Sequence, residues 1–189
     1  DNKLIDFKSP KDALENGVAM VHQELNQCLD RTVMDNLFLG RYPVRFGAVN
    51  ETKMQKDTDA LFASLGMSVN ARTIMRTMSV SQRQMVEIAK AVSYNAKVIV
   101  LDEPTSSLTE PEVIKLFSIV RTLSKRGVSF VYISHKMDEI FQICSEVAVL
   151  RDGRLTLAKN IHDTNMNELI SAMVGRSLEK RFPDVDNEV

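Results

Sequence analysis

Two adjacent carboxylates follow a short apolar segment near the middle of the chain. The segment reads Val-Ile-Val-Leu over residues 98–101, and Asp102 and Glu103 come next, just before Pro104. Four apolar residues, three of them β-branched, are typical of a strand buried on both faces of a parallel sheet. Ligands of open α/β sheets bind at the carboxyl ends of the strands. We therefore interpret Asp102 as a ligand for Mg²⁺ and Glu103 as the group that polarises a water for attack on a phosphoryl group. A solvated acidic turn is the alternative.

The chain has no phosphate-binding loop of the Gly-x-x-x-x-Gly-Lys-Ser/Thr type. In that loop, backbone N–H groups surround the β-phosphate and the lysine reaches the γ-phosphate. None of the seven glycines is followed by lysine. Either the protein is not of the P-loop class, or the loop lies before Asp1. We favour the second, because the first residues, Asp-Asn-Lys-Leu-Ile-Asp-Phe, resemble the middle of a β-hairpin.

Composition narrows the classes of protein that this chain can represent. With 189 residues it can form one domain with a core, or most of a larger one. A net charge of -1 gives no basic face for nucleic acid, so we expect no nucleic-acid partner. Cys28 and Cys144 have no paired spacing and are predicted to be buried thiols. No apolar stretch approaches the roughly 20 residues that span a bilayer, so any membrane role would be peripheral.

Alternating helices and strands must position the two carboxylates. Capping residues mark several helix starts, because Ser9, Thr32 and Asn50 each precede a helical pattern. The strand at 98–101, the helix after it and the strand at 128–133 form a βαβ unit with a right-handed crossover. A surface loop is predicted over residues 40–47. Helices are predicted over 10–16, 32–39, 50–64, 79–92, 110–125, 136–143 and 165–174, and strands over 18–21, 98–101, 128–133, 146–150 and 154–158.

Three more polar positions lie at the ends of these elements. Gln23 follows the first strand, and its amide oxygen could bind Mg²⁺ or water, although an exposed loop glutamine is the alternative. Ser79 opens a helix, where a hydroxyl and free N–H groups form an anion site, although simple capping is also possible. His135 follows the strand at 128–133, where an imidazole could hydrogen-bond a phosphate, although a structural role is the alternative.

In their order along the chain, these positions resemble the ATP-binding-cassette (ABC) ATPase family. Gln23 matches the Q-loop, the segment Met-Ser-Val-Ser-Gln at 78–82 the signature, Asp102 with Glu103 the Walker B end, and His135 the switch histidine. The segment Ser-Ser-Leu-Thr at 106–109 matches the D-loop. The resemblance covers nearly the whole chain, and it implies that the Walker A loop lies before Asp1.

The resemblance implies a role for each matched residue. Glu103 and His135 would be catalytic, and Gln23 and Asp102 would bind Mg²⁺. The signature segment would face the γ-phosphate held by a second ATPase domain, and the D-loop would cross the interface between the two domains. The residues expected to bind ATP with its Mg²⁺ are Gln23, Ser79, Val80, Ser81, Gln82, Asp102 and Ser107.

Two positions depart from the family pattern. The usual signature is Leu-Ser-Gly-Gly-Gln, whereas Val80 and Ser81 replace both glycines here. Side chains at these positions narrow the approach of the backbone to a phosphate. Thr109 stands where the D-loop usually has an aspartate. Neither change removes the expected metal ligand or the water-polarising carboxylate.

The expected fold class is α/β: a P-loop NTPase-like parallel sheet flanked by helices, with an ABC-type helical subdomain and the N-terminal part missing. We expect a partial ABC ATPase domain over residues 1–178, with the helical subdomain inserted at about 32–93. Residues 179–189 contain a proline, are polar and show no periodicity. They are predicted to be a linker toward a second ATPase domain.

Longer segments narrow the resemblance to bacterial sugar-import ATPases. These segments include Val-His-Gln-Glu-Leu-Asn at 21–26, Ser-Val-Ser-Gln-Arg-Gln-Met-Val-Glu-Ile-Ala-Lys-Ala at 79–91 and Tyr-Ile-Ser-His-Lys-Met-Asp-Glu-Ile-Phe at 132–141. The implied function is ATP hydrolysis that drives import of galactose, methyl galactoside or a related monosaccharide. The implied partners are a transmembrane sugar permease, a second ATPase domain in the same chain or a homodimer, and, indirectly, a periplasmic sugar-binding protein.

That function would place the protein peripherally on the cytoplasmic face of the bacterial inner membrane. Gln23 and residues 30–38 would be the part that couples to the permease. The alternative is a non-transport ABC-type ATP switch associated with ribosomes or DNA repair. In isolation, the 189-residue segment is expected to be an inactive fragment, because it lacks the phosphate-binding loop.

Overall fold

The structure is a computed structural model and describes residues 4–175. The chain divides into two compact units, with the boundary between Ser134 and His135. Among the described residues, no helix is both long and apolar enough to span a bilayer.

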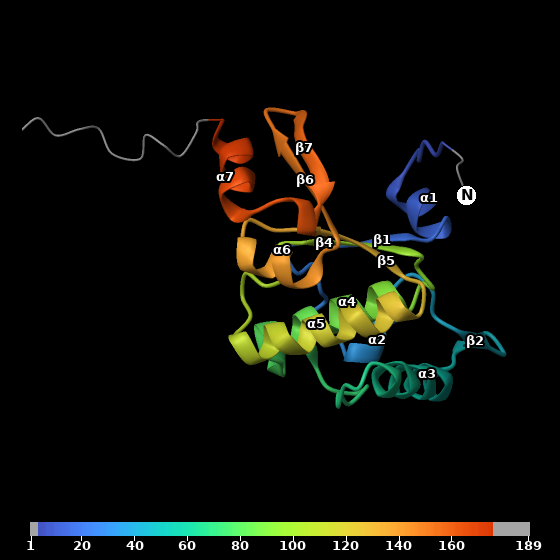
Figure 1. Cartoon of the computed structure of the whole chain (residues 1–189). Coiled ribbons are helices and arrows are strands. Elements are labelled where there is room, and N and C mark those ends of the chain that lie inside the picture. Colours follow the sequence, from blue (N-terminus) through green and yellow to red (C-terminus); the bar gives the residue numbers. More distant parts are fainter. Residues whose placement is uncertain (1–3, 176–189) are drawn as a thin grey trace, which may run out of the picture. The chain divides into compact units, whose positions relative to one another are not determined.

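A three-stranded parallel sheet organises the first unit (Figure 1). It consists of β1 (Val18–Val21), β4 (Val98–Asp102) and β5 (Ser129–Ile133) in the order β1-β4-β5. Val21 lies opposite Leu101, and Asp102 lies opposite Ile133. The carboxyl ends of all three strands therefore meet at one edge of the sheet. The predicted parallel βαβ arrangement is confirmed, with α5 (Glu110–Lys125) as the crossover helix.

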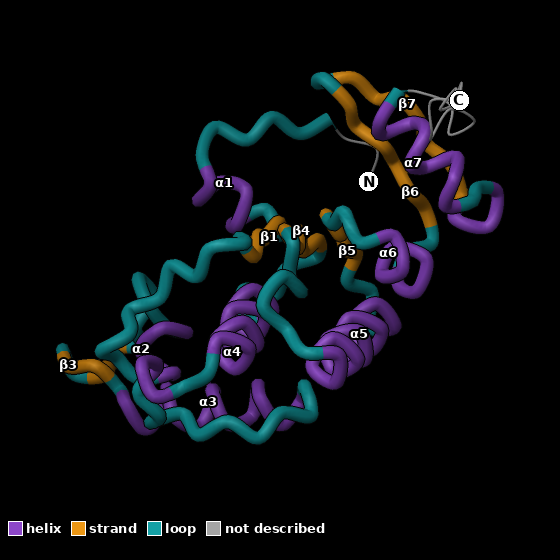
Figure 2. Tube along the Cα trace, turned by 90° about the vertical axis from the view of Figure 1, so that its left-hand side faces the viewer, coloured by secondary structure: helices purple, strands orange, loops and turns teal. Residues whose placement is uncertain are grey.

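Only one face of this sheet is buried. Ala19, Val21, Ile99 and Leu101 are buried, and α4 (Val80–Val92) and α5 lie side by side along the sheet, as Figure 2 shows. On the other face, alternate residues of the two outer strands, β1 and β5, are open to solvent, and those of β4 are half-buried. The exposed fractions are 44% for Met20, 49% for Val131 and 44% for Ile133.

The prediction that residues 98–101 are buried on both faces is therefore only partly correct, because Ile99 and Leu101 are buried whereas Val98 and Val100 are half-buried. An apolar run indicates that a strand could be buried on both faces, but burial also requires another element to cover each face. Helices α4 and α5 cover one face, with Phe117 and Ile88 fully buried beneath it. The strand positions themselves were predicted correctly to within a residue at each end.

Four helices occupy the segment between β1 and β4, and all but the 3-10 helix begin at a side-chain cap. They are α2 (Val33–Leu37), α3 (Glu51–Ser64), the 3-10 helix η1 (Met75–Thr77) and α4. The Thr32 hydroxyl accepts the Asp35 N–H at 3.2 Å, and Asn50 Oδ1 accepts the Lys53 N–H at 3.0 Å. Before β1, Ser9 caps α1 (Pro10–Glu15) in the same way. These predicted caps are confirmed, since capping chemistry is local.

Residues 40–47 are not simply a loop, because they include part of a β-hairpin. Strand β2 (Val44–Arg45) pairs antiparallel with β3 (Ala48–Val49) through the two-residue turn Phe46-Gly47. Both turn residues have a positive φ, 52° at Phe46 and 79° at Gly47. Hairpin turns of this kind favour Asn-Gly or Asp-Gly, so phenylalanine hides the turn from a sequence-based prediction.

The second unit contains a helix, a hairpin and a further helix. Its elements are α6 (Met137–Ile143), β6 (Glu146–Arg151), β7 (Arg154–Asn160), the 3-10 helix η2 (Ile161–Asp163) and α7 (Met166–Val174). An ion pair between Lys159 and Glu168 joins β7 to α7. The predicted linker at 179–189 lies outside the described residues. At the other end of the chain, residues 4–7 form no strand, so the hairpin expected there is wrong for these residues.

Candidate functional site

Asp102 and Glu103 lie at the carboxyl end of the central strand, β4. Asp102 is the last residue of the strand and is half-buried. The Glu103 N–H donates to the Ile133 carbonyl at 3.0 Å, which continues the ladder with β5. Glu103 has φ of 46°, a left-handed conformation that is costly for a residue other than glycine. Strained residues of this kind concentrate at functional sites, where the surrounding structure holds them in place.

A compact double turn leads from Glu103 to helix α5. The Ser106 N–H donates to the Glu103 carbonyl and the Leu108 N–H to the Thr105 carbonyl, both at 3.2 Å. Thr105 is buried within the turn, whereas Ser107 is exposed. The turn therefore presents Ser107 on the surface, as the predicted contact with a second domain requires.

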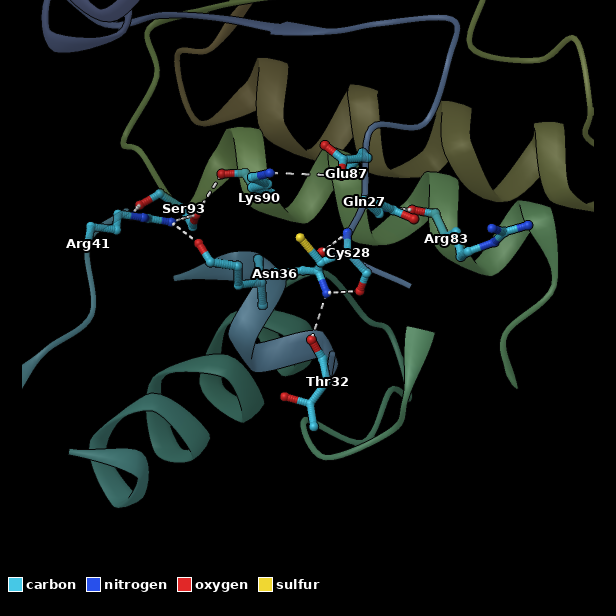
Figure 3. A network of polar contacts seen from close by, with 10 residues as sticks. Gln27, Cys28, Thr32, Asn36, Arg41, Arg83, Glu87, Lys90 and Ser93 are labelled. Atoms are coloured by element: carbon cyan, nitrogen blue, oxygen red, sulfur yellow. Dashed lines mark hydrogen bonds and ion pairs between the residues drawn. The ribbon is translucent and has the colours of Figure 1, made fainter. Parts of the chain in front are cut away.

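Gln23 lies on an exposed bend two residues beyond β1. Because β1 and β4 are neighbours in register, the bend starts at the same edge of the sheet as Asp102. Farther along this segment, Gln27 Nε2 donates to the Arg83 carbonyl in α4 at 2.8 Å. Figure 3 shows this bond among a network of polar contacts between the loop, α2 and α4.

Asn36 holds the far end of the same loop. Its side chain is 1% exposed. Asn36 Oδ1 accepts the Cys28 N–H at 2.8 Å, and Nδ2 donates to the Cys28 carbonyl at 3.1 Å and to the Thr32 carbonyl at 2.9 Å (Figure 3). One amide thus pairs with the backbone of Cys28 in both directions. Sequence reasoning missed Asn36, because nothing local marks its long-range partner.

The two cysteines differ from their predicted environment. Cys28 is exposed, and Cys144 is only partly buried. Both thiols are free. Burial raises the pKa of the Cys144 thiol above its ordinary value. The prediction of two buried thiols is therefore wrong for Cys28, whose backbone is held by Asn36 while the residue remains open to solvent.

The start of α4 carries a reciprocal cap. The Ser79 hydroxyl accepts the Gln82 N–H at 3.2 Å, and Gln82 Oε1 accepts the Ser79 N–H at 2.9 Å. The hydroxyls of Ser79 and Ser81 lie 2.9 Å apart. Ser81 is 7% exposed, whereas the Val80 side chain is open to solvent. Ser79 caps the helix and also lies at a helix N-terminus, so its position fits both the capping role and the anion site.

Glu112, in the first turn of α5, is a further carboxylate whose partners the sequence did not fully indicate. Glu112 Oε2 accepts bonds from the Thr109 N–H and the Thr109 hydroxyl, both at 2.8 Å. Hydrogen bonds from the Ser81 hydroxyl and then from Thr109 hold the pKa of the Glu112 carboxyl below its ordinary value. The Thr-x-x-Glu spacing of a capping box was the available signal for the Thr109 contact. No local pattern indicated Ser81.

A magnesium ion fits the residues at the strand end. Among residues 4–175, no three His, Cys, Asp or Glu side chains gather into a metal site by themselves. Mg²⁺ in phosphoryl-transfer sites is usually held by one or two carboxylates together with substrate phosphates. Asp102 supplies a carboxylate at the sheet edge, and hard oxygen ligands are what this ion prefers.

A hollow of about 230 Å³ lies beside the Gln23 bend. Its lining combines α1, the end of β1 and the second half of α4, and includes His22, Glu24, Glu87 and Lys90. Glu87 and Lys90 pair at 4.0 Å. A concave, partly charged surface therefore adjoins the loop that the sequence analysis expected to face a partner.

The first unit thus assembles the predicted residues at two places. Gln23, Asp102 and Glu103 share the carboxyl edge of the sheet, and Ser79, Val80, Ser81 and Gln82 form the start of α4. His135 is the first residue of the second unit and follows β5 by two residues in the sequence. Its expected contact with a phosphate stays a prediction.

Comparison with known proteins identifies the family of the chain. The sequence model described as "ABC transporter" matches residues 2–106, which include β1, α4, β4 and Glu103. The chain belongs to the ABC transporter family. The resemblance inferred from Gln23, the signature segment and the Walker B end is confirmed.

Curated relatives of this ABC chain share a single name. The galactose/methyl galactoside import ATP-binding protein of Treponema denticola is 76% identical over 186 residues, which cover 98% of this chain and 37% of that protein. The protein of the same name from Treponema pallidum is 74% identical over 189 residues, and the one from Escherichia coli K12 is 56% identical over 186. The chain spans 37% or 38% of the length of these relatives.

Solved structures confirm the predicted fold class. An ATP-binding cassette of an ABC transporter in its ADP conformation superposes with a TM-score of 0.72 at 20% identity, covering 89% of this chain and 72% of that one. The cbiO1 component of an ABC transporter complex from Clostridium perfringens gives a TM-score of 0.71 at 25% identity, covering 90% and 68%. The parallel sheet with flanking helices is therefore that of an ABC ATPase cassette.

Proposed function

We propose that this chain is part of an ATP-hydrolysing subunit that drives import of galactose, methyl galactoside or a related monosaccharide. The observation that carries the proposal is the pair Asp102 and Glu103 at the carboxyl end of the central strand, with Glu103 in a strained conformation. The name shared by the relatives, at up to 76% identity, supports the choice of substrate.

At the strand end, Glu103 polarises the attacking water and Asp102 binds Mg²⁺. The metal, when bound with ATP, supplies charge stabilisation at the phosphates. Gln23 lies at the same edge and contributes an amide oxygen to the metal or to a water. His135 hydrogen-bonds the γ-phosphate and senses its loss. Such a site also requires a phosphate-binding loop, which the 189 residues do not contain.

The start of α4 serves a second ATP molecule. Ser79 and the N–H groups of the first turn face the γ-phosphate held by a second ATPase domain, in the same chain or in a homodimer. The exposed Ser107 turn crosses the same interface. In this proposal residues 1–178 form one ATPase domain with the helical insertion at about 32–93, and residues 179–189 lead toward the second domain.

A transmembrane permease would be the partner that couples ATP hydrolysis to sugar transport. The hollow beside Gln23 offers a concave surface with both charges, and α2 follows within the same network of contacts. A cytoplasmic segment of the permease would dock there, so that closure of the two ATPase domains changes access in the membrane. The protein would then lie peripherally on the cytoplasmic face of the inner membrane, and a periplasmic sugar-binding protein would act on it only through the permease.

Reconstitution of the full-length protein with its permease tests this proposal. ATP hydrolysis should be stimulated by galactose, and sugar uptake should follow it. Gln23→Ala should reduce uptake more than hydrolysis, because the residue would link the site to the permease. Gln55→Ala, in α3, is the matched control and should change neither.

A different experimental result would contradict each part of the proposal. Equal loss of uptake and hydrolysis in Gln23→Ala would limit Gln23 to the metal site. Hydrolysis stimulated by ribose or arabinose and not by galactose would contradict the sugar. Hydrolysis with no permease recovered with the protein would favour the non-transport switch.

A further inference from the structure

A single arginine joins the C-terminal ends of α2 and α4. Arg41 Nη1 donates to the Ser93 carbonyl and Nη2 to the Leu37 carbonyl, both at 2.9 Å, and Nη2 also donates to the Ser93 hydroxyl (Figure 3). Leu37 is the last residue of α2, and Ser93 is the C-terminal capping residue of α4. Carbonyls at helix C-termini lack partners within the helix and carry partial negative charge. Charge-assisted bonds to both helices therefore hold the guanidinium in place.

The fixed guanidinium supports the ring of Tyr94. Its central carbon lies 3.9 Å from the centroid of that ring, which is a cation–π contact. Tyr94 lines the hollow of about 230 Å³ beside the Gln23 bend. Lys90 also lines this hollow, and its carbonyl accepts the Ser93 hydroxyl at 2.5 Å. Contacts from Arg41 and Ser93 therefore hold this wall of the hollow in place.

The charged residues of the hollow favour a basic occupant. Its lining includes two glutamates, Glu24 and Glu87, and one lysine, Lys90. Lys90 Nζ lies 4.0 Å from Glu87 Oε1, which is beyond hydrogen-bond distance. Among residues 4–175, no donor bonds to this buried oxygen. A buried carboxylate oxygen is stabilised by a donor, and an arginine or lysine of a docked segment would supply one.

We propose that the hollow binds a basic cytoplasmic segment of the permease, and that Arg41 is a positioning residue that holds Tyr94 ready to anchor that segment. The inference rests on the proposed function, in which a permease segment docks beside Gln23. Tyrosine contributes much of the binding energy at interfaces, because it buries a large area and loses little conformational freedom. A ring that Arg41 already holds loses still less freedom on binding.

The affinity of the full-length protein for its permease in lipid nanodiscs provides the first test. Tyr94→Ala removes the anchor and should weaken binding by about 10- to 100-fold. Arg41→Lys keeps the charge but loses the planar group that bonds to both helix ends, so it should weaken binding by about three- to tenfold. Glu87→Gln should weaken binding by a similar factor, because an amide does not form an ion pair with the docked cation.

Combined substitutions separate positioning of the ring from a general effect on folding. Because Arg41 acts through the ring, Arg41→Lys should have little further effect in a protein that already carries Tyr94→Ala. Arg45 and Phe46 are the matched control, since the Arg45 guanidinium lies 5.1 Å from the Phe46 ring centroid and neither residue lines the hollow. Arg45→Lys and Phe46→Ala should leave the permease affinity unchanged. An equal effect of Arg41→Lys with and without Tyr94→Ala would overturn the role of Arg41.

Fluorine NMR of the full-length protein labelled with fluorotyrosine provides a second test that does not depend on the permease. The Tyr94 signal is assigned by its loss in Tyr94→Phe, and Arg41→Lys should narrow it, because the ring gains motion. An unchanged Tyr94 signal would overturn the positioning role.

The binding measurement also distinguishes this inference from the proposed function. Failure of the unaltered protein to bind the permease would contradict the proposed function. Permease binding that Tyr94→Ala leaves intact would overturn this inference alone. Oligomers of the protein that dissociate in Tyr94→Ala would assign the hollow to a second copy of the chain and would also overturn it.

Discussion

The strand ends of the sheet and the helical segment at residues 22–92 hold their predicted site residues by different means. At the strand ends the backbone fixes position, since the Glu103 N–H continues the ladder to Ile133 before a left-handed turn. In the helical segment, side chains fix the backbone, as Asn36 does for Cys28 and Ser79 for the start of α4. We therefore expect a side-chain substitution at the strand ends to change the rate of ATP hydrolysis. A substitution in the helical segment should instead lower the free energy of unfolding.

The largest expected effect is on the rate of ATP hydrolysis in Glu103→Gln. The amide keeps the shape of the side chain and loses the charge that polarises water, so turnover in the full-length protein should fall by about 10²- to 10⁴-fold. Urea unfolding should be nearly unchanged, because the backbone holds this position. Asp59→Asn, an exposed carboxylate of α3, should keep normal turnover. Wild-type turnover in Glu103→Gln would end the catalytic assignment.

Asn36→Leu should produce the opposite pattern. It removes three hydrogen bonds at a position that is 1% exposed, so the free energy of unfolding should fall by about 2 to 4 kcal/mol. Urea unfolding followed by circular dichroism measures the loss. Asn26→Leu makes the same chemical change at an exposed position of the same loop and should cost little. Equal losses of unfolding free energy in Asn36→Leu and Asn26→Leu would show that the bonds from Asn36 to the Cys28 backbone do not stabilise the fold.

Ser79→Ala should act on stability and on nucleotide affinity together. Loss of the cap should destabilise the protein by about 1 kcal/mol. Asn50→Ala removes the equivalent cap of α3 and should give a similar loss by urea unfolding, with no change in KM for ATP. If KM changes equally in both variants, Ser79 has no role beyond capping.

Substitutions that relieve backbone strain should have smaller effects, and these effects should differ between the strand ends and the helical segment. Glu103→Asn and Phe46→Asn each place a residue that tolerates a positive φ where the present side chain is strained, at 46° and 52°. Each should raise the free energy of unfolding by a few tenths to about 1 kcal/mol. Only Glu103→Asn should abolish ATP hydrolysis. A loss of stability in Glu103→Asn would show that the glutamate side chain supports the fold.

The smallest expected effect is a difference in alkylation rate between the two cysteines, with no change in activity or stability. Cys28 is exposed, whereas burial raises the pKa of Cys144 and so reduces its thiolate fraction at pH 8. Cys28 should therefore react faster with iodoacetamide, as mass spectrometry of the alkylated peptides would show. The difference should shrink as the pH rises through the pKa of Cys144. Faster alkylation of Cys144 at pH 8 would contradict its partly buried environment.

The sequence predicted the features that depend on local chemistry. The caps at Ser9, Thr32, Asn50 and Ser79 need only a side-chain oxygen and the N–H three residues later, so they could be identified without the fold. The strand before Asp102 was identified by its β-branched residues.

Features that depend on distant partners could not be predicted. Whether Val131 is buried depends on what covers the second face of the sheet. The bond from the Gln27 amide to the Arg83 carbonyl joins a loop to helix α4, and no local pattern indicates that the two approach each other. The turn at Phe46 was missed for a different reason, since a phenylalanine occupies a position where asparagine or aspartate is expected.

The hairpin of β2 and β3 offers a practical attachment point for a spectroscopic label. Phe46 is 94% exposed at its tip, and the Asn50 N–H ties the base of the hairpin to the Pro43 carbonyl at 2.8 Å, directly before α3. A fluorophore or spin label at position 46 would move with the start of α3 and would touch neither the strand ends nor the α4 cap. Distances from such a label could follow the helical segment through a turnover cycle.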